Sequence, residues 1–138
     1  MHDITVSRAR LALRTNATFS TATGVIGIVA AGWVSDRSGI EPAWIVRLVG
    51  IGLLVFAADL IRQSRLPEAK LPFALLQTSI ADVGWIVATP VVIAIADLTR
   101  TGTIGAIVIA AVVLDLALAQ MWVRSKLVAP AQPAVAAA

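Results

Sequence analysis

Cysteine is absent from the 138 residues and histidine occurs once, and these two shortages exclude several kinds of chemistry. Without cysteine there are no disulfides, thiolate metal sites, iron–sulfur clusters or cysteine nucleophiles. The only histidine is His2, outside any apolar segment, so haem ligation, histidine-based zinc sites and a Ser-His-Asp arrangement are not expected. Because there is no phosphate-binding loop or dinucleotide fingerprint either, we expect no cofactor, no metal site and no enzymatic activity.

Charged residues are also scarce, at 14% of the chain against about 25% in soluble domains. Hydrophobic residues reach 59%, against about 45–50% in soluble domains. A soluble fold of this size would lack the polar residues needed to cover its surface, so the sequence predicts an integral membrane protein. The net charge of +3 does not indicate nucleic-acid binding, because the basic residues lie at the ends of apolar segments.

Four apolar segments are long enough to cross a bilayer, which requires about 20 helical residues. We predict an all-α, four-helix transmembrane bundle in residues 15–123, preceded by a cytoplasmic segment (1–14) and followed by a disordered cytoplasmic tail (124–138). A signal peptide is the alternative for the first segment, although its length and its threonines disfavour that interpretation. The predicted spans are 15–35, 43–61, 73–96 and 104–123.

Lysine and arginine are distributed unevenly between the connecting segments. Of the 11 basic residues, eight lie in the N-terminal segment, the loop between the second and third spans, and the tail. Arg37 and Arg100 occupy the other two loops, and Arg47 lies inside the second span. Because basic residues accumulate on the cytoplasmic side of membrane proteins, both termini are expected in the cytoplasm.

Ionisable side chains inside the spans are the candidate functional residues, because a charge at the bilayer centre costs about 2.5–3.5 kcal/mol. Asp82 and Asp115 each lie about nine residues from the cytoplasmic end of their span, which puts both about 13 Å deep. We expect the two carboxyl groups to face each other, with at least one of them protonated. They would form a proton or cation relay or, alternatively, hold the helices together by hydrogen bonds.

Asp59 and Arg47 lie nearer to the ends of the second span. Asp59 is expected to pair with Arg62 three residues later, with Arg14 and Asn16 as alternative partners. Arg47 is expected to reach the lipid headgroups or an acidic residue of the loops.

Trp85 and a polar stripe complete the set of candidates. Trp85, beside Asp82, is expected to pack in the core with its N–H directed at a carboxylate, and cation–π binding of a substrate is the alternative. Small and hydroxylated residues share one face of the first span and favour close helix contact, with the lining of a water-filled path as the alternative. They are Asn16, Ser20, Thr23, Gly27 and Ala31.

Three stretches carry a family resemblance: LRTNATFSTATG, RLVGIGLLVFAADLIRQSR and IADVGWIV. They resemble a family of small bacterial integral membrane proteins with four helices and no assigned activity. The resemblance implies a multi-pass protein of the bacterial plasma membrane.

Two classes of function follow from these observations. The first is a non-catalytic structural or accessory component of a membrane assembly, with lipid and either copies of itself or a larger complex as partners. The alternative is a proton-coupled small transporter or channel that uses Asp82 and Asp115, with Asp59 as the cytoplasmic step. We favour the first class, because four helices barely enclose a water-filled path.

Overall fold

The computed structural model describes residues 2–129, and within that range the chain is helical and contains no strand. The prediction of an all-α fold is therefore confirmed for these residues. The elements are α1 (His2–Val29), α2 (Ala31–Ser38), α3 (Ala43–Gln63), the short 3₁₀ helix η1 (Glu68–Lys70), α4 (Leu71–Ile95) and α5 (Arg100–Val128).

Three segments are long and apolar enough to cross a membrane: α3, the stretch Glu68–Ile95 and α5. The segment predicted as a first span, 15–35, is not one straight helix. α1 reaches the hydropathy of a membrane span only together with α2, and the two are bent by 91°. The bend lies at Ala30, whose backbone leaves the helical conformation with φ −105° and ψ 23°.

α2 turns across the end of the bundle and contacts the connection between α4 and α5. The carbonyl oxygen of Ser38 accepts a hydrogen bond from the Thr99 N–H at 2.9 Å. A Cβ atom on Gly102 would overlap that same carbonyl group, so only glycine permits this approach. Gly39 ends α2 in the left-handed conformation with φ +80°, which glycine adopts without strain.

The boundaries of the end segments differ from those expected. α1 begins at His2, so residues 2–14 belong to the first helix and do not form a segment of their own. Ala9 and Leu13 of this stretch are fully buried. α5 continues to Val128, so 124–128 are helical rather than part of a disordered tail. A hydrogen bond ties this extension to α4, because Arg124 Nε donates to the carbonyl of Pro72 at 3.1 Å. The rest of the predicted tail, 130–138, lies outside the described residues.

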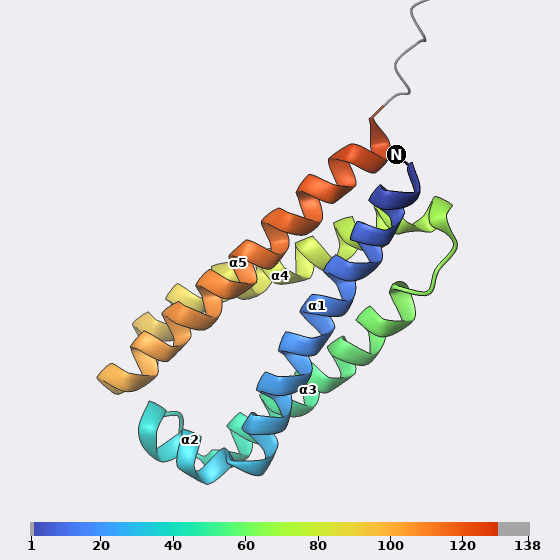
Figure 1. Ribbon diagram of the computed structural model, residues 1–138. Helices are drawn as coiled ribbons and strands as arrows, with labels where there is room; N and C mark the ends of the chain where they lie inside the picture. Colours follow the sequence, from blue (N-terminus) through green and yellow to red (C-terminus); the bar gives the residue numbers. More distant parts are fainter. Residues whose placement is uncertain (1, 130–138) are drawn as a thin grey trace, which may run out of the picture.

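The helices form two pairs, α1 with α3 and α4 with α5, and α1 also contacts α5 (Figure 1). The start of α1, the connection between α3 and α4, and the end of α5 lie at one end of the bundle, which we call the basic end (Figure 1). α2 and the connection between α4 and α5 lie at the opposite end, which we call the α2 end.

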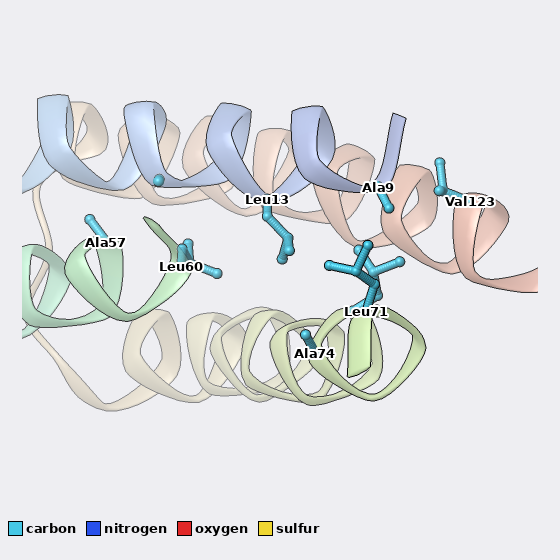
Figure 2. Packing of buried hydrophobic residues seen from close by; sticks show 9 residues of the cluster. Ala9, Leu13, Ala57, Leu60, Leu71, Ala74 and Val123 are labelled. Carbon is cyan, nitrogen blue, oxygen red and sulfur yellow. The ribbon is translucent and has the colours of Figure 1, made fainter. Parts of the chain in front are cut away.

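The apolar core lies at the basic end. Leu13, Leu60 and Leu71 are fully buried and come from α1, α3 and α4, as Figure 2 shows. Small residues such as Ala57 and Ala74 complete the cluster and let the backbones approach. The basic end is therefore closed by packed leucine and alanine side chains.

Candidate functional site

Asp82 on α4 is a buried carboxylate that connects three helices. Its side chain is 4% exposed, and its Oδ2 atom accepts hydrogen bonds from Asn16 Nδ2 of α1 at 2.8 Å and Gln120 Nε2 of α5 at 3.0 Å. Ser20 donates to Asn16 Oδ1 at 3.2 Å. We call these four residues the Asp82 cluster. Because every member is buried and three separate helices contribute, the cluster fixes the two helix pairs against each other.

Two further buried polar atoms, one on α4 and one on α5, have no hydrogen-bond partner among the described residues. They are the Oε1 atom of Gln120, a residue already bonded to Asp82, and the hydroxyl of Ser79, three residues before Asp82 on α4. Ser79 is 3% exposed and Gln120 is fully buried. Both atoms can accept hydrogen bonds, so they are available to a donor such as a water molecule near Asp82.

A second polar network lies at the end of α3. Arg62 donates to Asp59 Oδ1, with the Nη2 atom at 2.6 Å, so the predicted ion pair is confirmed. Gln63 donates to the other carboxylate oxygen of Asp59 and accepts from Thr78 Oγ1 at 3.2 Å. Thr78 precedes Asp82 by one helical turn on α4, so the two networks are neighbours.

Asp115 does not join Asp82. The prediction that the two carboxyl groups face each other is wrong, because Asp115 is exposed while Asp82 is buried. The buried face of α5 contains Val113, Ala117 and Gln120, and Asp115 lies two residues from each of the first two. Two residues correspond to about 200° around a helix, so Asp115 is on the opposite face. The expected relay between the two aspartates has no geometric basis within the described residues.

Neither Trp85 nor Arg47 is a hydrogen-bond partner of Asp82 among the described residues. Trp85 is 37% exposed, and the carboxylate we expected it to reach is bonded by the amides of Asn16 and Gln120 instead. Arg47 is exposed, as expected for a side chain that reaches the headgroups, and makes no ion pair with any carboxylate in residues 2–129.

A cavity of about 510 Å³ opens between the two helix pairs toward the α2 end. We call it the inter-pair cavity; all five α-helices contribute to its lining. Trp33 and Trp85 lie in its wall, and Arg37 is the one charged residue of the lining among residues 2–129. The polar stripe of α1 contributes to both features. Asn16 and Ser20 belong to the Asp82 cluster, whereas Thr23 and Gly27 line the cavity.

Gln120 was not among the candidate residues predicted from the sequence. A signal for it exists, because it follows Val113 and Ala117 at helical spacing and is a polar residue in an apolar segment. Among residues 2–129, no group of three or more histidine, cysteine, aspartate or glutamate side chains is placed to hold a metal ion.

Comparison of the chain with protein-family models, with curated proteins and with solved structures gives no match in any of the three.

Proposed function

We propose that the protein is a non-catalytic integral membrane protein that serves as a structural or accessory component of a membrane assembly. Asp115 carries this proposal. It lies within a helix that is apolar enough to span a membrane, it faces outward, and no partner in residues 2–129 contacts its carboxyl group. Ionisable residues in spanning helices almost always face protein or water, because exposure to lipid is costly. A second chain that covers this face would remove the cost.

The Asp82 cluster supports the same proposal. Its carboxylate is held by two amide donors from neighbouring helices, which is the arrangement of an interhelical connection. The apolar core lies between this cluster and the basic end, with Leu13 and Leu75 fully buried. A proton path to that end would have to pass this packed layer.

The proposed topology has four spans, with both termini in the cytoplasm of a bacterial cell and the bundle in the plasma membrane. α1 has 28 residues and is about 42 Å long, enough to cross about 30 Å of hydrocarbon. α2 then lies along the opposite membrane surface, since it is bent by 91° from α1. The eight basic residues of the connecting segments belong to elements that meet at the basic end, which supports its placement in the cytoplasm.

A reagent that does not cross membranes tests this orientation. In intact cells we expect it to label cysteine in E41C, near the α2 end, and not in A69C, in the connection between α3 and α4. Both positions are exposed, and the protein has no cysteine that would interfere. Labelling of A69C alone would contradict the proposed orientation.

A proton-coupled transporter or channel is the second candidate. The inter-pair cavity favours it, because Trp85 in the cavity wall is three residues from Asp82 on α4. The unpartnered atoms of Ser79 and Gln120 favour it too, because they provide hydrogen-bond acceptors for a water molecule that would carry protons to Asp82.

Proton flux into liposomes separates the two candidates. Purified protein is reconstituted around a pH-sensitive dye, a pH gradient is applied, and a proton ionophore confirms the gradient at the end. We expect the wild type and D82N to give the same slow leak as protein-free liposomes, since Asp82 is a structural connection. Flux through the wild type that D82N abolishes would show that the second candidate is right.

A further inference from the structure

The inter-pair cavity is long enough to hold an extended molecule. On α5 its lining extends from Thr101 to Ile109, about 12 Å along the helix axis. Arg37 lies in the cavity wall near the α2 end, and Trp85 lies in the wall on the side of the Asp82 cluster. Its volume of about 510 Å³ is within the range of sites that bind small molecules, about 300–1,000 Å³.

The lining selects a ligand with an apolar body. Apart from Arg37, the wall consists of aliphatic, tryptophan, glycine and hydroxyl residues. Thr89, one of the hydroxyl residues, donates to the backbone carbonyl of Trp85 at 2.9 Å. The missing side chain of Gly105 leaves real space, because a Cβ atom placed there would meet nothing within 4 Å.

Arg37 selects a ligand with an anionic head. The guanidinium group lies 5.5 Å from the centre of the Trp33 ring, which positions it at the cavity wall. It makes no ion pair with any carboxylate of residues 2–129, although Asp36 is its neighbour in sequence. A guanidinium group without a carboxylate partner at the end of an apolar cavity matches an acidic group that is joined to an apolar chain.

We propose that the inter-pair cavity binds a fatty-acid-like anion, with its acyl chain between the helix pairs and its carboxylate at Arg37. Such an anion has an apolar chain and a charged head, which match the apolar wall and Arg37. A lipid bilayer contains fatty acids of this kind. This inference is independent of the proposed function, since it requires neither proton transfer by Asp82 nor a second chain at Asp115.

Quenching of tryptophan fluorescence by brominated stearic acid tests the proposal. The variant W44F/W122F keeps only Trp33 and Trp85, the two tryptophans of the cavity wall. We expect saturable quenching by the acid in detergent, and about tenfold weaker binding of its methyl ester, the loss expected for one charge-assisted hydrogen bond. The reverse variant, W33F/W85F, reports on tryptophans outside the cavity and should not distinguish acid from ester.

Two substitutions in the same background locate the ligand. R37Q should lower the affinity for the acid to that for the ester, and G105L should weaken both by filling the cavity. G84L is the matched control, because Gly84 has open space around it and does not line the cavity. Circular dichroism confirms that each variant is folded. Equal binding of acid and ester, or binding that G105L leaves unchanged, would overturn the proposal.

Discussion

Replacement of Asp82 by leucine is expected to lower the free energy of unfolding by about 2 kcal/mol or more, since each stranded buried amide costs about 1–3 kcal/mol. The substitution removes the oxygen that accepts from Asn16 and Gln120, which contribute from α1 and α5. Both amides are buried, and among residues 2–129 their nitrogen atoms make no hydrogen bond other than those to Asp82. Unfolding in detergent, followed by circular dichroism, measures the change.

Two control variants separate the loss of hydrogen bonds from the loss of charge. D82N should keep most of the stability, because its amide oxygen still accepts from both partners and its new N–H group has Gln120 Oε1 as an available acceptor. D115L should leave the stability of the isolated chain unchanged or higher, since Asp115 has no partner among residues 2–129. Equal destabilisation by D82N and D82L would show that charge, not hydrogen bonding, is what the site requires.

The class of the fold was predictable from the sequence, because composition and the length of the apolar segments determine it. α3, α4 and α5 correspond to predicted spans, since long apolar segments between polar loops leave helices as the main option in a bilayer. The Asp59–Arg62 ion pair was predictable for a similar reason. Residues three apart on a helix are neighbours whatever the rest of the fold does.

The partner of Asp82 was not predicted, because matching depth does not determine direction. Asp82 and Asp115 are equally far from the ends of their predicted spans, but they face different sides of their helices. The helical spacing of Val113, Ala117 and Gln120 would have identified the buried face of α5. Small and amide side chains on one face indicate close packing better than a carboxylate at equal depth does.

The bend at Ala30 and the inter-pair cavity depend on contacts that no local pattern contains. α2 turns because Ser38 meets Thr99 and Gly102, residues about 60 positions later in the chain. The cavity exists because the helix pairs are joined at the basic end by the leucine core and are separated toward the α2 end. Both features follow from how the pairs are placed in space.

A second chain at the outward face of α5 is expected to be captured by a photoreactive residue placed beside Asp115. Ala111 precedes Asp115 by one helical turn, is exposed, and lies on the same face. A benzoylphenylalanine at this position contacts whatever covers that face in the cell membrane. We expect a covalent adduct of defined mass, because a carboxyl group in a spanning helix requires a polar partner. Twice the mass of the chain would indicate self-association, and another mass a larger assembly.

Asp115 itself decides whether that adduct reflects the proposed interface. The control position is Val55, which is 67% exposed on α3 and lies one helical turn before Asp59, a carboxylate that already has Arg62 as its partner. Irradiation of intact membranes, followed by electrophoresis and mass spectrometry, should give an adduct at position 111 and none at position 55. The adduct should disappear when D115L is introduced into the same chain. Absence of an adduct at position 111, or adducts at both positions that D115L leaves unchanged, would contradict a role in a membrane assembly.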